Sequence, residues 1–148
     1  MKPNDFSGIR ILLVEDERFI RGIVRRMLQS LGSRDVREAV DGTEALRLLD
    51  GGFLPDLVFC DFKMEPMDGL TFMRQVRESA DPVRAGLPLI MLTAATDEET
   101  VRTALGLGVG GYLLKPVSPK MLADRMNAAL RLRDRSVALD LAPREAQL

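Results

Sequence analysis

The stretch Leu57–Asp61, with the sequence LVFCD, places one carboxylate at the end of an otherwise apolar run. Pro55 and Asp56 precede this run, and the polar segment 62–69, which contains a proline and a glycine, follows it. An apolar run bounded in this way is typical of a β-strand buried on both faces. We therefore predict that Asp61 lies where a buried strand leaves the core, at the sheet edge where ligands and chemistry collect.

Segments with strand and helix patterns alternate on both sides of this stretch. Four further runs have the composition of strands, and five segments have apolar residues at helical spacing. Such an alternation implies right-handed crossovers and a parallel sheet covered on both faces, so we predict a doubly wound α/β fold with five strands and five helices. The further strands are expected at 9–14, 36–40, 89–93 and 112–115, and the helices at 19–31, 45–49, 70–78, 96–107 and from 119 onward.

Two of the predicted helices carry signals at their first residues. Thr96 and Glu99 have the spacing of a capping box, and Ser118 followed by Pro119 supplies an N-cap and a first-turn proline. Between the third and fourth helices, the prolines and the glycine of 82–88 predict only a break in the chain.

Composition excludes several classes of function. The chain has 148 residues, 46% of them hydrophobic, which suits one domain. Its 21 basic and 22 acidic residues nearly cancel, so no overall charge attracts nucleic acid or an anionic membrane. A single cysteine excludes an internal disulfide, and no signal peptide or membrane-length apolar span is visible, so we expect a cytoplasmic protein without membrane insertion. The lack of histidine excludes the common histidine metal sites, Ser-His triads and phosphohistidine carriers.

The ends of the chain differ from its middle in composition. We predict a short N-terminal lead at 1–8, one folded domain at 9–131, and a C-terminal segment at 132–148 that either prolongs the last helix or forms a tail. The arginines near this end have no aromatic residues among them, so we do not expect them to bind nucleic acid. These arginines are Arg125, Arg131, Arg133 and Arg135.

Polar side chains follow four of the five predicted strands. Glu15 and Asp16 follow the first strand, while Asp61, Thr93 and Lys115 end the third, fourth and fifth. In a parallel sheet these positions share one edge, and crowded carboxylates there raise one another's pKa unless a cation lies among them. Oxygen ligands without histidine or cysteine favour Mg²⁺. An aspartate beside Mg²⁺, a lysine and a hydroxyl can attack phosphorus and form an acyl phosphate.

Taken in order, these motifs resemble the receiver domain of two-component response regulators. The resemblance covers about residues 9–130, and the chemotaxis-type single-domain members are the most similar in layout. Each motif alone is weak, but the order of all of them on successive strands is specific. The motifs are Glu15-Asp16, Asp61 followed by Met64, Met67-Asp68-Gly69, Thr93-Ala94, and Tyr112-Leu113-Leu114-Lys115-Pro116.

The resemblance implies a flavodoxin-like receiver fold with strand order 2-1-3-4-5. It also implies that Asp61 accepts a phosphoryl group from a histidine kinase or phosphotransfer protein, and that Lys115 contacts this group. Asp16, Asp61 and the backbone carbonyl of Lys63 would hold Mg²⁺, with Glu15 acting through the waters of the metal.

A conformational switch is implied as well. Thr93 would move toward the phosphoryl oxygen and Tyr112 would rotate inward, remodelling the face formed by helix 4, strand 5 and helix 5. That face would bind a downstream protein or a second copy of the chain. The resemblance further implies a cis peptide before Pro116, and a signalling switch that catalyses only its own phosphorylation and dephosphorylation.

Simpler interpretations exist for the individual residues. The acids at 15–17 suit the first turn of a helix, Lys115 alone could be a solvated lysine, and Tyr112 alone could be a core aromatic residue. Two other functions also fit the architecture: a receiver-like interaction module that works without phosphorylation, and a flavodoxin-like cofactor binder. The cofactor binder lacks support because no Ser/Thr/Gly-rich phosphate loop follows the first strand. The sequence identifies neither the cognate kinase nor the downstream target.

Overall fold

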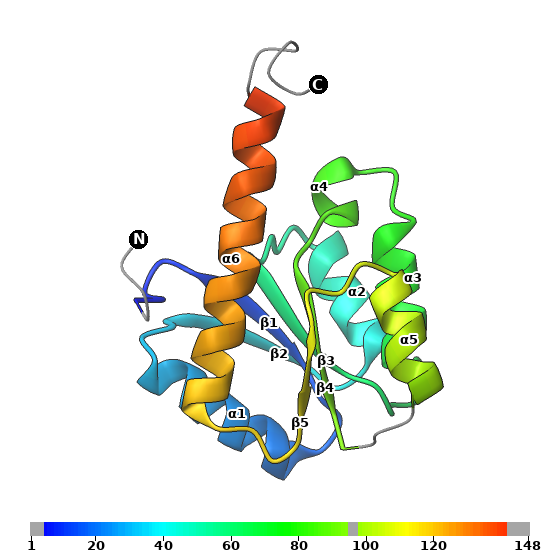
Figure 1. Ribbon diagram of the computed structural model, residues 1–148. Coiled ribbons are helices and arrows are strands. Elements are labelled where there is room, and N and C mark those ends of the chain that lie inside the picture. The colour runs from blue at the N-terminus through cyan, green and yellow to red at the C-terminus, as the bar shows by residue number, and fades with distance from the viewer. Residues whose placement is uncertain (1–4, 95–97, 142–148) are drawn as a thin grey trace.

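A computed structural model describes residues 5–94 and 98–141, with 135–141 described by their backbone alone. Five parallel strands form one sheet in the order β2-β1-β3-β4-β5. Helices cover both of its faces (Figure 1). The predicted doubly wound fold and its strand order are therefore confirmed.

The elements lie close to the predicted ranges, and β3 and β4 coincide with them. The strands are β1 (Arg10–Val14), β2 (Asp35–Ala39), β3 (Leu57–Asp61), β4 (Leu89–Thr93) and β5 (Tyr112–Leu114). The helices are α1 (Arg18–Ser30), α2 (Gly42–Asp50), α3 (Gly69–Arg77), α4 (Pro82–Ala85), α5 (Glu98–Gly106) and α6 (Pro119–Leu141).

The prediction of five helices was wrong by one, because α4 forms where we expected only a break. Its single turn begins with Pro82, and the Asp81 side chain caps it by accepting a hydrogen bond from the Val83 amide at 3.0 Å. A proline at the first helical position starts a turn as readily as it ends one. The predicted helices 4 and 5 are thus α5 and α6, and the predicted switch face is the α5–β5–α6 face.

Alternating side chains of the strands build a separate core on each face of the sheet. On β3, Val58 and Cys60 pack on the side of α2 and α3, whereas Leu57 and Phe59 pack on the side of α1 and α6. All five β3 residues are buried, as expected for a central parallel strand. Phe6, within the predicted N-terminal lead, is fully buried in the core on the α1 and α6 side.

Short polar side chains begin three of the longer helices. Asp41 accepts a hydrogen bond from the Glu44 amide, and Asp68 accepts one from the Thr71 amide. The predicted cap at Ser118 is confirmed, because its Oγ accepts the Met121 amide at 3.2 Å. The predicted capping box at Thr96 lies outside the described residues.

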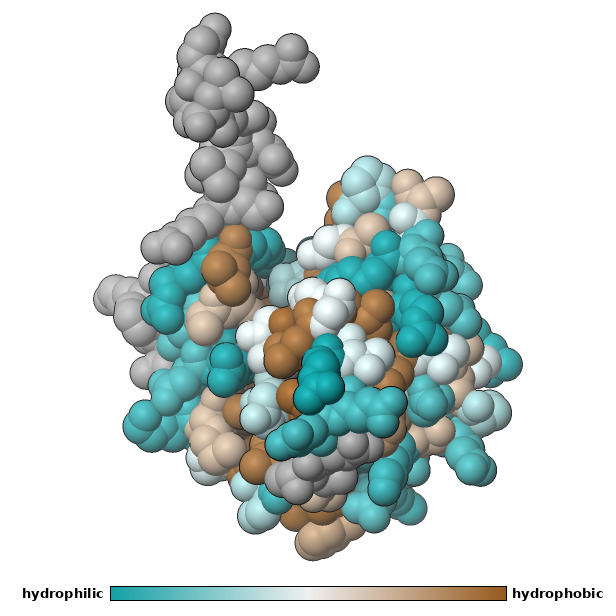
Figure 2. All heavy atoms as spheres, turned by 45° about the vertical axis from the view of Figure 1, so that its right-hand side comes forward, coloured by the Kyte–Doolittle hydropathy of each residue, from teal (hydrophilic) through white to brown (hydrophobic). Residues whose placement is uncertain are grey.

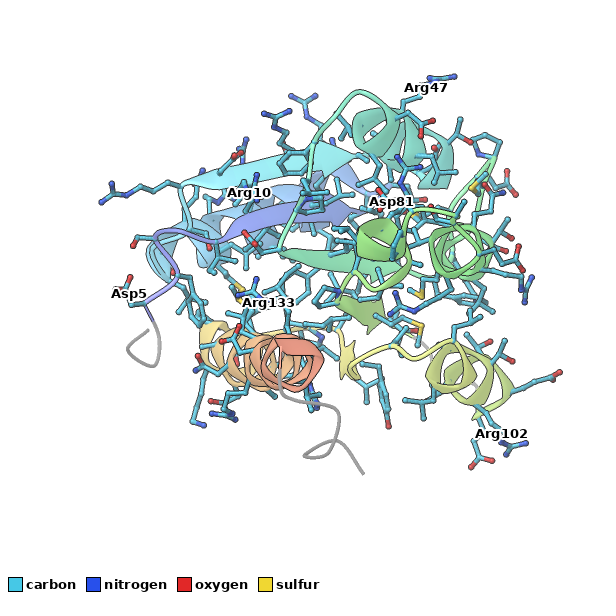
Figure 3. The ribbon with its side chains drawn as sticks, turned by 90° about the horizontal axis from the view of Figure 1, so that it is seen from above. Asp5, Arg10, Arg47, Asp81, Arg102 and Arg133 are labelled. Carbon is cyan, nitrogen blue, oxygen red and sulfur yellow. The ribbon has the colours of Figure 1, made fainter. Side chains whose placement is uncertain are left out.

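The last helix, α6, is one continuous element of 23 residues that crosses the predicted boundary between residues 131 and 132. Its far end stands clear of the sheet (Figure 1). Arg133 of α6 has its Nη1 3.1 Å from Asp56 Oδ1. Asp56 directly precedes β3 and also accepts the Arg10 amide at 2.8 Å, so one carboxylate joins α6 to the start of β1. Figure 3 views the molecule from above and labels Arg10 and Arg133.

Arg77 connects two loops at the same edge of the molecule. Its guanidinium donates to the backbone carbonyls of Ala85 and Leu87 on one side, and to those of Leu107 and Gly108 on the other. The donor–acceptor distances run from 2.6 to 3.1 Å. A single side chain therefore satisfies the carbonyls of two connections that precede β4 and β5.

Candidate functional site

The carboxyl ends of four strands meet around one cleft of about 710 Å³. Asp61 ends β3, Thr93 ends β4, Lys115 follows β5, and Asp16 lies just after β1. All four line the cleft, as do the predicted metal-binding residue Lys63 and the first turn of α1. Glu15 is fully buried beside them. The structure therefore brings together the side chains that the sequence placed at the strand ends.

Lys115 is held between two carboxylates. Its Nζ lies 3.1 Å from Asp61 Oδ2 and donates a second hydrogen bond to Glu15 Oε1. The Lys115 amide bonds to the Thr93 carbonyl at 2.8 Å, which continues the pairing of β4 with β5 beyond its last residue. The peptide between Lys115 and Pro116 is cis, as predicted, and the Glu65–Pro66 peptide is cis as well.

The positive charge of Lys115 does not balance the acids around it. Burial raises the pKa of Glu15 to about 8, and the neighbouring Asp61 adds to this effect more than Lys115 opposes it. Burial by itself would lower the pKa of Lys115, but its bond to Glu15 and the charge of Asp61 raise it. Lys115 thus stays an ammonium, while Glu15 holds its proton to a higher pH than an ordinary glutamate does.

The residues present fit a hard divalent cation. Glu15, Asp16 and Asp61 each offer a carboxylate oxygen, and these oxygens lie within 4.8 Å of one another. Opposite ligands of Mg²⁺ are separated by about 4.2 Å, so a small adjustment would let them share one ion. Burial is the main cause of the raised Glu15 pKa, and a cation there would stabilise the charged carboxylate and offset the added effect of Asp61. For the Lys63 backbone carbonyl, metal binding stays a prediction.

The two predicted switch residues have different environments. Thr93 is almost fully buried at the cleft, whereas Tyr112 is 40% exposed at the start of β5. Tyr112 pairs with Met91, and Leu114 pairs with Thr93, along the same two strands. Thr93 and Tyr112 are therefore connected through the β4–β5 ladder, and Tyr112 lies in an outward position.

Two residues that the sequence did not assign to the site support it. The Arg21 side chain, on α1, donates to the Glu15 carbonyl at 2.8 Å and lies 3.4 Å from Glu38. Gly69 begins α3 directly against Asp61, because a Cβ atom there would lie only 2.1 Å from the Asp61 carbonyl oxygen. Gly69 belongs to one of the motifs in the sequence, but no sequence pattern predicts its contact with Asp61. No sequence pattern points to Arg21.

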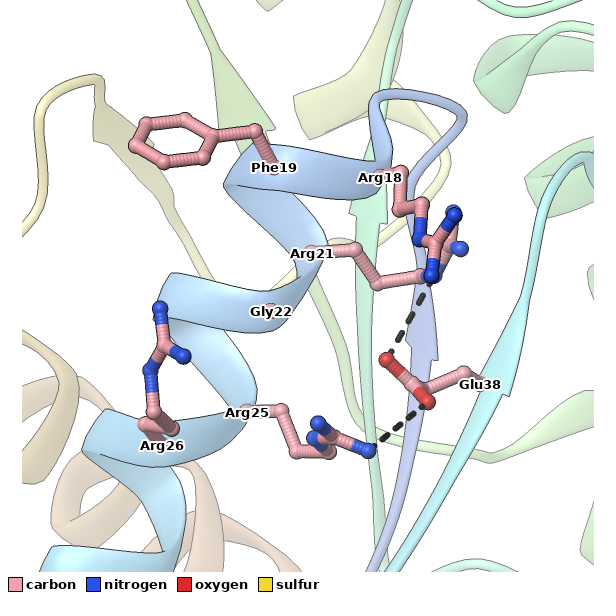
Figure 4. A pocket seen from close by; sticks show the side chains of 7 residues that line it. All are labelled: Arg18, Phe19, Arg21, Gly22, Arg25, Arg26 and Glu38. Atoms are coloured by element: carbon pink, nitrogen blue, oxygen red, sulfur yellow. Dashed lines mark hydrogen bonds and ion pairs between the residues drawn. The ribbon is translucent and has the colours of Figure 1, made fainter.

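A second hollow, of about 600 Å³, lies along α1 and reaches Glu38 of β2 (Figure 4). Gly22 leaves open space in its middle, and Phe19, 74% exposed, stands on one side. The acid of the hollow, Glu38, contacts two of the arginines (Figure 4). The α1 surface beside the cleft is therefore positively charged, and its arginines are Arg18, Arg21, Arg25 and Arg26.

Residues 11–127 match the family described as the response regulator receiver domain. The chain belongs to this family. The predicted resemblance is thereby confirmed. Receiver domains are signalling switches, not enzymes in the ordinary sense, and they typically bind Mg²⁺ at an acidic site. They interact with histidine kinases and downstream targets.

Individual relatives agree with this assignment and with the chemotaxis-type layout. The chain is 34% identical to the chemotaxis protein CheY1 of Helicobacter pylori over 85% of its own length and 100% of that protein. It is 41% identical to the Regulator of RpoS of Escherichia coli over 74% of its length, but spans only 31% of that protein. The solved structure of CheY4 from Vibrio cholerae matches with a TM-score of 0.72 and 30% identity, covering 82% of this chain and 98% of that one. None of the helices described here is both long and apolar enough to cross a membrane.

Replacing Gly69 by alanine should destabilise the protein and disturb Asp61. The new Cβ would overlap a backbone carbonyl that cannot rotate away, so we expect a loss of about 2 kcal/mol or more in the free energy of unfolding. Gly22→Ala is the matched control, since nothing lies within 4 Å of its Cβ position and alanine favours a helix by about 1 kcal/mol. Urea unfolding measures both variants, and equal stabilities would contradict the proposed close approach.

The raised pKa of Glu15 predicts a pH-dependent stability in the presence of a chelator. Glu15 titrates near 4.5 when unfolded and near 8 when folded, so the folded protein binds more protons between these values. Its contribution to the unfolding free energy is complete below about pH 4.5 and is lost as the pH rises through 8. Glu15→Gln should flatten this part of the profile, whereas Glu17→Gln, an exposed neighbour, should leave it unchanged. An unaltered profile in Glu15→Gln would disprove the assignment.

Proposed function

We propose that the chain is a phosphorylation-dependent receiver whose Asp61 accepts a phosphoryl group from a phosphohistidine. The observation that carries this proposal is the ion pair of Lys115 with Asp61, 3.1 Å long, at an open cleft with two further carboxylates. The proposal includes 9–131 as the receiver unit, 132–148 as a helix extension or tail, and a cytoplasmic location.

In this proposal, one carboxylate oxygen of Asp61 forms a bond to phosphorus while the phosphorus–nitrogen bond of the donor breaks. The electron pair of that bond stays on the imidazole nitrogen of the donor. Lys115 would offset charge on the phosphoryl oxygens, and Thr93 would donate to one of them. Mg²⁺, held by Asp16, Asp61 and the Lys63 carbonyl near Glu15, would supply further positive charge at the transferred group.

The proposed output is a change in the α5–β5–α6 face. Tyr112 and Leu114 on β5 are each 40% exposed and line a hollow of about 540 Å³ with Val101 and Leu105 of α5. Movement of Thr93 toward a phosphoryl oxygen would be accompanied by an inward turn of Tyr112, and the two residues lie on paired strands. The apolar surface offered to a downstream protein, or to a second copy, would then differ between the two states.

Acetyl phosphate and beryllofluoride test the proposal directly. The parent should be labelled on Asp61 in the presence of Mg²⁺ and not with a chelator, whereas Asp61→Asn should not be labelled at all. Phosphate-affinity electrophoresis and mass spectrometry measure the label, and Asp56→Asn serves as a control carboxylate at the other edge of the sheet. A parent that is not labelled even with Mg²⁺ would favour the alternative, an interaction module that works without phosphorylation, and labelling of Asp61→Asn would place the phosphoryl group on another residue.

We infer further that the phosphoryl donor covers the α1 surface. Glu17 and Ile20 at the start of α1 line the Asp61 cleft, and Arg18, Phe19 and Arg21 beside them in sequence line the arginine-rich hollow. A protein that reaches Asp61 from the solvent would therefore lie against the first turns of this helix. Phe19 offers an apolar anchor there, and the arginines favour a donor with acidic side chains around its histidine.

Reversing one charge on α1 should separate protein donors from small donors. Arg18→Glu should slow transfer from a phosphorylated histidine-kinase domain that labels the parent, by about tenfold, because steering and docking are both weakened. Labelling by acetyl phosphate should not change, since this donor needs no docking surface. Arg102→Glu on α5 is the control, because Arg102 is an exposed arginine away from α1. Equal loss with both donors would place the effect in the cleft and not at α1.

A further inference from the structure

The arginine-rich hollow on α1 differs in character from the groove between α4 and α6. That groove, of about 570 Å³, has largely apolar walls (Figure 2). On α1, one of the arginines that line the hollow reaches past the surface to the backbone of the functional site. This residue is Arg21, and only 16% of its side chain is exposed.

Arg21 uses two different donors of its guanidinium. Its Nη1 donates to the Glu15 carbonyl at 2.8 Å, and its Nε lies 3.4 Å from Glu38 Oε1 on β2 (Figure 4). The other carboxylate oxygen of Glu38 lies 3.5 Å from Arg25 Nη1, so Glu38 is itself held on both sides. A planar guanidinium fixes the directions of its donors, whereas a lysine ammonium on a flexible stem does not. Arg21 therefore ties the Glu15 carbonyl to a fixed point on β2.

The carbonyl that Arg21 holds belongs to the peptide that joins two acids of the site. Because a peptide is planar, the direction of the Glu15 carbonyl sets the plane from which the chain continues into Asp16. The Glu15 amide donates to the Ala39 carbonyl at 3.0 Å. Ala39 directly follows Glu38 on β2. Two successive β2 residues thus fix the amide and the carbonyl of Glu15, one of them directly and the other through Arg21.

The acids need such a hold because they repel one another. Glu15, Asp16 and Asp61 place carboxylate oxygens within 4.8 Å of one another. Asp61 ends a strand with all five residues buried, whereas Asp16 is exposed in the turn between β1 and α1. A rotation of this turn is the easiest way to relieve the repulsion, and it would separate carboxylates that share one ion.

We propose that Arg21 is a positioning residue for the metal site and that Glu38 holds it in place. The inference rests on the proposed function, in which the acids of the cleft bind Mg²⁺. Arg21 would contact neither the ion nor the phosphoryl group, and would act through the peptide between Glu15 and Asp16. Partners that orient the ligands of a metal from outside typically contribute about 10- to 100-fold to its affinity.

The sign of the effect separates positioning from charge. Arg21 brings a positive charge close to the acids, so charge alone predicts that Arg21→Gln binds Mg²⁺ more tightly. Loss of the held peptide predicts weaker binding. We expect Arg21→Gln to weaken Mg²⁺ binding about tenfold in calorimetric titrations of the full chain. Arg21→Lys keeps the charge but not the fork of donors, so its loss should be intermediate.

Arg37→Gln is the matched control for the loss of one positive charge. Arg37 directly precedes Glu38 on β2, but its guanidinium lies 4.4 Å from the centre of the Phe53 ring. Phe53 belongs to the core on the α2 and α3 side, away from α1. Its Mg²⁺ affinity should equal that of the parent, and circular dichroism checks that each variant keeps its fold.

A double-mutant cycle tests whether Glu38 acts through Arg21. Glu38→Gln alone should weaken Mg²⁺ binding, because Arg21 loses the partner that holds it. In the Arg21→Gln background the same change should have no further effect, since the residue through which Glu38 acts is already gone. Losses that simply add would mean that Glu38 acts by its own charge, and would overturn the proposed sequence of contacts.

Two further outcomes separate this inference from the proposed function. An Arg21→Gln protein that binds Mg²⁺ as tightly as the parent, or more tightly, would overturn the role of Arg21 and leave the metal site intact. A parent without Mg²⁺ binding would contradict the metal site of the proposed function, and the role of Arg21 with it. Calorimetry needs no phosphoryl donor, so neither result depends on the labelling of Asp61.

Discussion

The functional site depends on an electrostatic imbalance, because the positive charge of one lysine lies between two buried acids, Glu15 and Asp61. Lys115 reaches both Glu15 and Asp61, but burial and the repulsion between the acids still raise the pKa of Glu15 to about 8. Removing charge from water is costly unless it is compensated. The site is therefore electrostatically incomplete on its own, and this property suits a cleft that admits both a cation and a charged group to be transferred.

The fold keeps these charges together because it makes every strand end at the same edge. Asp61 sits on a strand with all five residues buried, so its backbone cannot shift to relieve repulsion. Gly69 lets α3 begin against the Asp61 carbonyl, and Arg21 fixes the Glu15 carbonyl from α1. The hydrophobic core therefore makes the sheet rigid, and the loops that follow its strands supply the polar groups of the site.

Sequence patterns predicted the parts of this arrangement that follow from periodicity. The strand ends at Asp61 and Thr93 were visible because apolar runs stop there, and parallel pairing then required them to meet near Lys115. The four-residue α4 was missed because one turn has no period to detect. Arg21 was missed for a different reason: a side chain that reaches a carbonyl of a neighbouring turn leaves no pattern in the sequence. The course of α6 past Arg131 stayed open because charges alternate there with leucines.

The two edges of the sheet separate two kinds of interaction. At the carboxyl edge, polar groups surround the cleft that we propose for phosphoryl transfer. At the amino edge, Arg77 and the Arg133–Asp56 pair tie the connections and α6 into a fixed frame around an apolar groove. Because the Arg133–Asp56 pair holds α6, a phosphorylation signal passed to the α5–β5–α6 face would act mainly through α5 and β5.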